Sequence, residues 1–190
     1  MPFTRAELAS YRDRTVEDLL GDDVRLLFVG INPGLWTAAT GAHFAHPGNR
    51  FYPALLAAGI LEHPMRVSEG MSDDDRRTLV DRGVGITNLA ARATARADEL
   101  TPEELRAGAD RLVRTVERVH PRAVAMVGIT AYRAAFGRAK ARQGRQEEPI
   151  AGVPLWVLPN PSGLNAHDTV ESLGRAYREP AVAAGLVPQE

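Results

Sequence analysis

The chain has 190 residues, a formal net charge of −1, an apolar fraction of 44% and a charged fraction of 25%. These proportions are typical of globular proteins and argue against disordered and fibrous classes, and a chain of this length is expected to form one domain. The absence of cysteine excludes disulfides, thiolate zinc sites and a cysteine nucleophile. The near-neutral net charge gives no general reason to expect nucleic-acid binding.

The amino-terminal residues are charged and lack the apolar core of a signal peptide. No window approaches the roughly 18 apolar residues that a membrane span needs. We therefore expect neither export by that route nor insertion in a bilayer. The lack of cysteine is compatible with a reducing compartment, and the expected location is the cytoplasm, at the nucleoid if the source is prokaryotic.

Short apolar runs without strict alternation predict strands that are buried on both faces, as in a parallel sheet. Helical patterns lie between them. The predicted order is helix 5–20, strand 24–31, helix 49–59, helix 73–82, strand 84–89, helix 101–119, strand 123–129, helix 131–138, strand 154–159 and a final helix within 168–186. This alternation predicts an α/β fold, a three-layer α/β/α sandwich with a short, mainly parallel sheet of four to five strands. We treat residues 1–190 as a single domain, with the first helix and the last few residues peripheral.

Two of these helices have capping boxes in the sequence. Thr101 is the predicted N-cap of the longest helix, with Pro102 at the first helical position and Glu104 at the third. The final helix has the same kind of start, with Asp168 as the predicted N-cap and Glu171 at the third position. The segment 139–149 is polar and is predicted to be a loop.

An asparagine follows or ends three of the predicted strands: Asn32, Asn88 and Asn160. Because ligands bind beyond the carboxyl ends of parallel strands, these three side chains are expected at one edge of the sheet, next to the ligand. Asn32-Pro33-Gly34 and the Asn-Pro-Ser-Gly segment at 160–163 are each explained most simply as tight turns. Two such turns in one small sheet favour a shared site.

The chemistry available to this site is restricted. Residues 30–52 contain no acid, and neither a nucleophile elbow nor a dinucleotide or phosphate-binding glycine pattern is present. An asparagine amide cannot act as a general base, but it can hold a water molecule in position. A site built on Asn32 must therefore act by positioning, on a substrate with a good leaving group.

His43 and His46 have a spacing that occurs in metal sites. No cysteine is present and no carboxylate lies between Ala38 and Leu61, so a third ligand would have to come from elsewhere. We predict no metal site and no nucleotide cofactor.

One part of the chain is locally basic. The segment from Ile129 to Gln146 contains no acid but five cations, Arg133, Arg138, Lys140, Arg142 and Arg145. The simplest interpretation is a solvated helix end and loop.

Three segments of the sequence are similar to a known family. GINPGLWTAATGAHFAHPGNRFY (30–52) and WVLPNPSGLN (156–165), with GITNLAARAT (85–94) between them, resemble the mismatch-specific uracil/thymine DNA glycosylases, a branch of the uracil-DNA glycosylase superfamily. The similarity runs from about Val24 to Ala184. It implies an α/β/α sandwich and no metal or redox cofactor, with Asn32 as the catalytic residue that positions the water attacking C1′ of a flipped deoxynucleotide.

The resemblance also implies a base pocket formed by Gly30, Ile31, Thr37, His43 and Phe44. Backbone groups around Ile31 and near Phe44 would recognise the pyrimidine edge, and the Phe44 ring would stack on the base. The role of His43 is open. Thr37 stands where the family has serine or alanine and would crowd a thymine methyl, so uracil is expected to be preferred over thymine.

A second implied region contacts the DNA stack after the base has left it. Its residues are Asn160, Ser162, Gly163, Leu164 and Asn165. Leu164 would be the apolar wedge, although a core position at the approach to the last helix is the alternative. A well-known member has arginine where Ala166 stands, and Asn165 and His167 are the candidate substitutes. Lys140, Arg142 and Arg145 become candidate phosphate contacts.

The predicted function is a DNA repair glycosylase that flips mispaired uracil out of the duplex and hydrolyses its N-glycosidic bond, leaving an abasic site. Thymine and damaged pyrimidines are further candidate substrates. Lys140 is the only lysine and lies in a polar loop, so no Schiff base and no strand cleavage are expected. The expected partner is duplex DNA with a G·U or related mispair, not a membrane, and the protein is expected to be a monomer. One alternative is a non-catalytic mismatch- or lesion-binding module of the same fold, and a weaker one is a hydrolase of free nucleosides.

Overall fold

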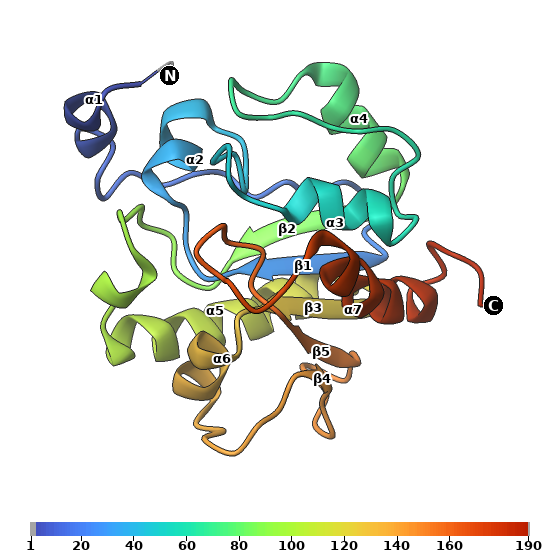
Figure 1. Cartoon of the computed structure of the whole chain (residues 1–190). Helices are drawn as coiled ribbons and strands as arrows, with labels where there is room; N and C mark the ends of the chain where they lie inside the picture. Colours follow the sequence, from blue (N-terminus) through green and yellow to red (C-terminus); the bar gives the residue numbers. More distant parts are fainter. Residues whose placement is uncertain (1–2, 190) are drawn as a thin grey trace.

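A computed structural model describes residues 3–189 and shows a five-stranded sheet between two layers of helices (Figure 1). The strand order is β2-β1-β3-β5-β4. The strands are β1 (Leu26–Gly30), β2 (Val84–Asn88), β3 (Ala123–Val127), β4 (Gly144–Arg145) and β5 (Leu155–Leu158). All neighbours pair in parallel except β4, which is antiparallel to β5. The predicted α/β/α sandwich with a short, mainly parallel sheet is confirmed.

The helices divide between the two faces of the sheet. They are α1 (Arg5–Ala9), α2 (Leu35–Thr40), α3 (Phe51–Ala57), α4 (Asp73–Asp81), the 3-10 turn η1 (Ala97–Glu99), α5 (Pro102–Val119), α6 (Ile129–Phe136) and α7 (Val170–Ala183). Figure 1 shows α3, α4 and α7 on one side of the sheet and α5 and α6 on the other. In β1, Leu26 and Phe28 pack into the first of these layers while Leu27 and Val29 pack into the second. Both faces of the strand are therefore buried, which is why its sequence does not alternate.

The prediction of a helix over residues 5–20 is wrong beyond Ala9. Residues 10–13 form a turn after α1, and the chain beyond it joins the edge of the sheet through isolated bridges at Thr15 and Leu19. Leu19 exchanges backbone hydrogen bonds with Ile86 of β2, at 2.9 and 2.8 Å, and its side chain is buried. Pairing with an existing sheet edge satisfies the same backbone groups that a helix would, and it also buries Leu19.

The predicted capping box of α5 is present, because the Thr101 hydroxyl accepts from the Glu104 backbone N–H and the Glu104 carboxylate accepts from that of Thr101. The prediction for α7 is wrong. Its N-cap is Thr169, whose hydroxyl accepts from the Ser172 N–H, and not Asp168. The Asp168 carboxylate is already bonded to other side chains, so the next residue caps the helix.

Other boundaries differ by smaller amounts. Helix α2 lies inside the segment 30–48, where no helix was predicted. Helix α6 starts two residues earlier than expected, at Ile129. Strand β4 lies in the segment 139–149 that was predicted to be a loop. Within residues 3–189, no helix combines the length and apolar character needed to cross a bilayer.

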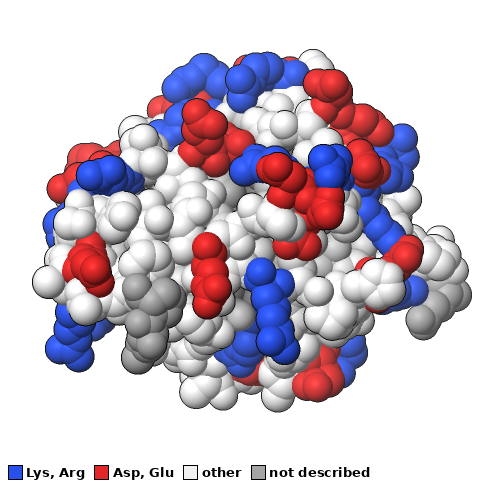
Figure 2. Space-filling model, turned by 90° about the horizontal axis from the view of Figure 1, so that it is seen from above, with Lys and Arg blue, Asp and Glu red and all other residues white. Residues whose placement is uncertain are grey.

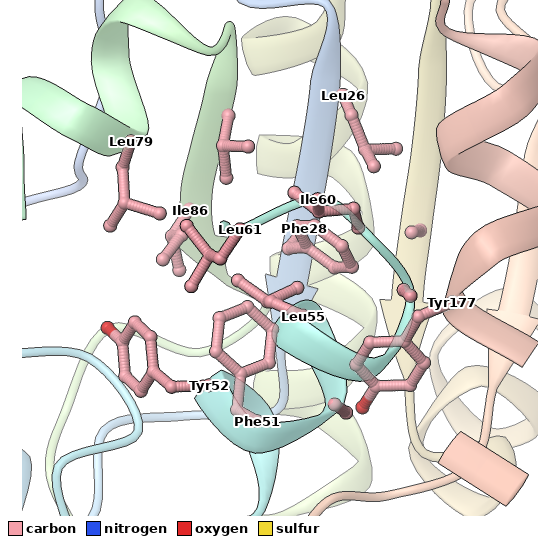
Figure 3. Close-up of a cluster of buried hydrophobic side chains, with 14 of the residues drawn as sticks. Leu26, Phe28, Phe51, Tyr52, Leu55, Ile60, Leu61, Leu79, Ile86 and Tyr177 are labelled. Carbon is pink, nitrogen blue, oxygen red and sulfur yellow. The ribbon is translucent and has the colours of Figure 1, made fainter. Parts of the chain in front are cut away.

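An aromatic cluster lies between β1, α3 and α7 (Figure 3). The Phe28 ring is 5.1 Å from Phe51 and 5.7 Å from Tyr177, measured between ring centres. All three side chains are fully buried. Full burial of a side chain of this kind contributes about 1.5–3 kcal/mol to the stability of the fold. The packing of these rings therefore holds the start of α3, which carries Phe51, against β1 and α7.

Candidate active site

The carboxyl ends of the parallel strands bring the predicted site residues together. Asn88 lies opposite Gly30 in the β1–β2 register, and a Cβ placed on Gly30 would lie 2.4 Å from Asn88 Oδ1. A Cβ on Gly128, just after β3, would lie 3.1 Å from the Ile31 side chain and 3.9 Å from Asn160 Nδ2. The expectation that the three asparagines stand at one edge is therefore confirmed. The strand order reverses between β1 and β3. Ligands commonly bind at such a switch point, at the carboxyl edge of the sheet.

The side-chain amide of Asn32 is held in one orientation. Its Nδ2 donates to the Pro33 carbonyl at 3.1 Å, the Arg92 carbonyl at 3.0 Å and the Thr94 hydroxyl at 2.8 Å. Carbonyl oxygens can only accept, and the Thr94 hydroxyl gives its own hydrogen to the Arg96 carbonyl at 2.7 Å. The amide nitrogen must therefore face this group of acceptors.

The oxygen of the same amide is left available. Asn32 Oδ1 accepts no hydrogen bond from residues 3–189, and it is not among the buried, unpaired side-chain atoms. Asn32 is itself partly buried. The result is a fixed acceptor that water can reach, which is the arrangement needed to orient a water molecule.

Arg92 fixes the segment that holds Asn32. Its guanidinium contacts the Glu104 carboxylate, Asp13 Oδ1 at 2.9 Å and the Glu99 carbonyl at 3.1 Å. The hydrogen bond from Arg92 lowers the pKa of Glu104 to about 2, with help from the capping hydrogen bond of Thr101. The first turn of α5 is thereby connected to the acceptors around the Asn32 amide.

His43 is buried, with 3% of its surface exposed. Its Nε2 lies 2.8 Å from the Glu17 carbonyl, so Nε2 carries the proton. Burial lowers the pKa of His43 below its usual 6.5, so the ring is neutral at pH 7 and its Nδ1 has a free lone pair. That lone pair accepts from Asn88 Nδ2 at 3.2 Å. Asn88 Oδ1 is consequently on the side of Gly30.

Asn88 is a candidate site residue to which the sequence interpretation gave no role. It was placed at the edge of the sheet but not assigned a role. The available signal was its position at the end of β2, directly opposite Gly30 in a parallel register. That signal needs the strand pairing, which the sequence does not specify.

The Phe44 ring also lies next to Gly30, since its Cζ would be 3.3 Å from a Cβ placed there. Its ring stacks on Phe51 with centres 4.0 Å apart and planes at 17°. The neighbouring Tyr52 hydroxyl donates to the His43 carbonyl at 2.9 Å. Phe44 has a φ of 56°, which is unusual for a residue other than glycine and is found where the surroundings impose it. Consecutive residues of α3 therefore hold this aromatic ring in place.

Thr37, predicted for the base pocket, and His46, considered as a metal ligand, also have clear positions. Thr37 is buried on α2, which the Trp36 indole anchors by donating to the Ser68 carbonyl at 2.8 Å. His46 is exposed, and its Nδ1 accepts from the Gly48 N–H at 3.1 Å. Among residues 3–189, no group of three or more acids and histidines is arranged to bind a metal ion.

Leu164 lies at the tip of the loop 160–168, which we call the wedge loop. It is 91% exposed, and no other large hydrophobic residue within residues 3–189 is exposed. The alternative of a core position for Leu164 is therefore wrong. The side chains of the other predicted residues shape the loop: Asn160 Oδ1 accepts from the Ser162 N–H at 3.0 Å, and Asn165 Nδ2 donates to the Asn160 carbonyl at 3.0 Å.

The structure does not bring the candidate phosphate contacts to this edge. In Figure 1 the segment 137–148 lies below the sheet, apart from α2 and the wedge loop. There Lys140, Arg142 and Arg145 line a cavity of about 630 Å³ together with acidic side chains, and the Arg145 guanidinium lies over the Trp156 ring. Phosphate binding by this segment stays a prediction.

Figure 2 shows the face of the molecule above α2, α3 and α4. Basic and acidic side chains are interspersed on it, without a continuous basic surface. This face therefore has no electrostatic character that favours a polyanion.

Comparison with known proteins agrees with the fold. The sequence profile of the Uracil DNA glycosylase superfamily matches residues 18–183, which include both the Asn32 segment and the wedge loop. The fold is similar to the solution NMR structure of a Methanosarcina acetivorans protein assigned as a uracil DNA glycosylase, with a TM-score of 0.60 and 18% identity over 88% of this chain and 98% of that chain. At that identity the structural likeness concerns the fold alone. The profile match spans most of the chain, and the chain therefore belongs to the uracil DNA glycosylase superfamily.

Proposed function

We propose that this protein is a monofunctional DNA glycosylase that removes mispaired uracil from duplex DNA by hydrolysis. Membership of the uracil DNA glycosylase superfamily supports hydrolytic glycosylase activity on DNA in general. The observation that carries the proposed mechanism is the Asn32 amide, whose nitrogen is bonded to three acceptors while its oxygen faces solvent.

Asn32 Oδ1 accepts a hydrogen bond from a water molecule and directs the water's lone pair toward C1′ of the flipped nucleotide. The C1′–O bond forms as the C1′–N1 bond breaks, and the proton that the attacking water loses passes to solvent. The departing uracil leaves as a delocalised anion, which backbone N–H donors stabilise in a pocket closed to water. Neither the Ile31 nor the Phe44 N–H is paired with an acceptor within residues 3–189. These two backbone groups are the candidate donors to the leaving base.

Asn88 discriminates among pyrimidines. Its Oδ1 points to the pocket because its Nδ2 is bonded to His43. Uracil presents an N3–H that this oxygen accepts, whereas cytosine presents a lone pair at N3, which leaves the amide oxygen opposite another acceptor. An unpaired or repelled buried polar group is costly, so uracil is preferred. Stacking on Phe44 adds affinity that does not depend on the base.

The preference for mispairs follows from the cost of flipping. Extruding a base costs a few kcal/mol, and least when the base is mispaired. Leu164, exposed at the tip of the wedge loop, enters the gap that the base leaves. By the family resemblance, Thr37 would crowd a thymine methyl, so we expect uracil to be favoured over thymine. The groups needed for the reaction all belong to a single chain, and a monomer is sufficient.

A labelled duplex with a central G·U pair tests the proposal. The wild type releases free uracil and leaves an alkali-labile site, without strand breaks before the alkali step, because Lys140, the only lysine, is exposed in the segment 137–148. Asn32→Ala retains DNA affinity but loses at least about a hundredfold in excision rate, the scale expected for removing a positioning group. Absence of uracil release by the wild type, or full activity of Asn32→Ala, contradicts the mechanism.

The same assay separates the alternatives. A non-catalytic binding module would retain G·U duplex tightly and release no base. A nucleoside hydrolase would act on free deoxyuridine and would be unaffected by Leu164→Ala. A substrate panel of G·U, A·U, G·T, ethenocytosine and single-stranded uracil then defines the base range.

A further inference from the structure

Arg50, which precedes α3, makes several contacts to the wedge loop. Its guanidinium donates to the Ser162 carbonyl at 2.7 Å and the Asn165 carbonyl at 2.6 Å, and it also contacts the Asp168 carbonyl. Its backbone N–H donates to the Pro161 carbonyl at 2.9 Å. A planar guanidinium can hold acceptors in several directions at once, which a lysine ammonium on its flexible stem does less rigidly.

These contacts are what join the wedge loop to the rest of the protein. Within residues 3–189, the remaining hydrogen bonds recorded for residues 161–168 are internal to the loop or go to Ser172 in α7. The main chains also touch directly, because a Cβ on Gly163 would lie 2.7 Å from the Gly48 carbonyl oxygen. The loop therefore rests on residues 48–50.

We propose that Arg50 is a positioning residue that sets the orientation of the wedge loop and so presents Leu164 to the DNA stack. An exposed leucine gains by folding back onto apolar surface, so a loop that keeps it 91% exposed must be ordered before DNA arrives. Ordering in advance removes an entropic cost at the moment of binding. This inference rests on the proposed function, since Leu164 is a wedge only if the protein opens a duplex.

The same segment also supports the base pocket. Phe51 follows Arg50 directly, and its ring is the platform on which Phe44 stacks. The positions of the wedge loop and of the pocket aromatic are thus set by adjacent residues at the start of α3. Arg50 therefore links the wedge loop, which would fill the gap in the duplex, to the Phe44 ring, which would stack on the flipped base.

Arg50→Gln and Arg50→Lys test the inference, with Arg25→Gln as the matched control. Arg25 also donates to backbone carbonyls, those of Arg82 and Gly185, and both arginines have a buried Nε without a hydrogen-bond partner. Arg25 precedes β1, at the opposite edge of the sheet from the wedge loop. A third perturbation, Gly163→Ala, pushes the loop away from Gly48 without touching the guanidinium.

Hydrogen exchange of peptides that cover residues 161–168 gives a readout independent of activity. We expect exchange about tenfold faster in both Arg50 variants and in Gly163→Ala, and unchanged exchange there in Arg25→Gln. Unchanged protection in a folded Arg50 variant overturns the inference. Because this readout needs no DNA, it remains decisive even if the wild type proves to have no glycosylase activity, a result that would overturn the proposed function instead.

A double-mutant cycle tests whether Arg50 acts on excision through Leu164. Arg50→Gln should slow excision from a G·U duplex by about the same factor as Leu164→Ala, and the double variant should be no slower than either single variant. The rate on single-stranded uracil, where no stack has to be opened, should be unchanged by Arg50→Gln. A purely structural role would instead lower both rates together and give multiplicative losses in the cycle.

Discussion

The hydroxyl of Thr94 is the part of the Asn32 support that can be removed most cleanly. Thr94 is 1% exposed, and its hydroxyl accepts from Asn32 Nδ2 and donates to the Arg96 carbonyl. Thr94→Val deletes both hydrogen bonds and keeps the shape of the side chain. Thr94→Ser keeps both bonds and loses one methyl group, so it is the matched control.

The size of the effect follows from the two lost bonds. Each contributes about 0.5–1.5 kcal/mol net, so Thr94→Val should lower the free energy of unfolding by about 1–3 kcal/mol. In a protein of this size that lowers Tm by roughly 2–4 °C for each kcal/mol. The two carbonyl acceptors of Asn32, those of Pro33 and Arg92, remain in place and prevent a full amide flip. Excision should therefore slow by about twofold to about tenfold, the equivalent of one hydrogen bond.

Single-turnover excision from a G·U duplex, together with DNA affinity and thermal unfolding, measures these effects. We expect the rate and Tm to fall in Thr94→Val, DNA affinity to stay the same, and Thr94→Ser to behave much like the wild type. A folded Thr94→Val protein with the wild-type rate would refute the idea that this hydroxyl holds the catalytic amide. Equal losses in the serine variant would show that the methyl group matters instead.

Three other predictions concern the pocket and its support. Burial lowers the pKa of His43 in the folded protein. The stability that neutral His43 contributes is therefore present above pH 6.5 and is lost as the pH falls from 6.5 through the lowered pKa. The value of kcat/KM should fall in the same window, and the pH profile of His43→Gln should be flatter. Gly30→Ala places a methyl group 2.4 Å from Asn88 Oδ1, so uracil excision should drop about tenfold or more with a smaller change in Tm, and an unchanged rate would argue against the role of Asn88. Gly108→Ala places a methyl group 2.2 Å from the Leu89 carbonyl oxygen, so denaturant unfolding should show a loss of about 1–3 kcal/mol, whereas a gain would mean that helix propensity outweighs the clash.

Features that depend on neighbouring residues were predicted correctly from the sequence. The capping box at Thr101 was assigned because its hydrogen bonds span three residues. The doubly buried strands were recognisable from continuous apolar runs, and the common edge of Asn32, Asn88 and Asn160 follows from the parallel direction of those strands. Asn32 itself was singled out by its motif.

Local signals were less reliable where a tertiary contact competed with them. Residues 10–20 were predicted to continue a helix, but residues 10–13 form a turn, and beyond it Leu19 pairs with Ile86 of a strand more than sixty residues away in sequence. Asp168 had the right spacing for an N-cap, but its carboxylate bonds to Asn165 and Ser172 instead. In each case a distant or side-chain partner satisfied the group that the local pattern had assigned elsewhere.

The sequence by itself indicated the four parallel strands, their common carboxyl edge and the asparagines placed there. Only the tertiary structure decided which way the Asn32 amide faces, because its acceptors Arg92 and Thr94 lie about sixty residues further along the chain. It also decided the orientation of Asn88 through a buried, neutral His43. Periodicity and capping are encoded within a few residues, whereas the direction of a hydrogen bond depends on which distant atoms the completed fold places beside it.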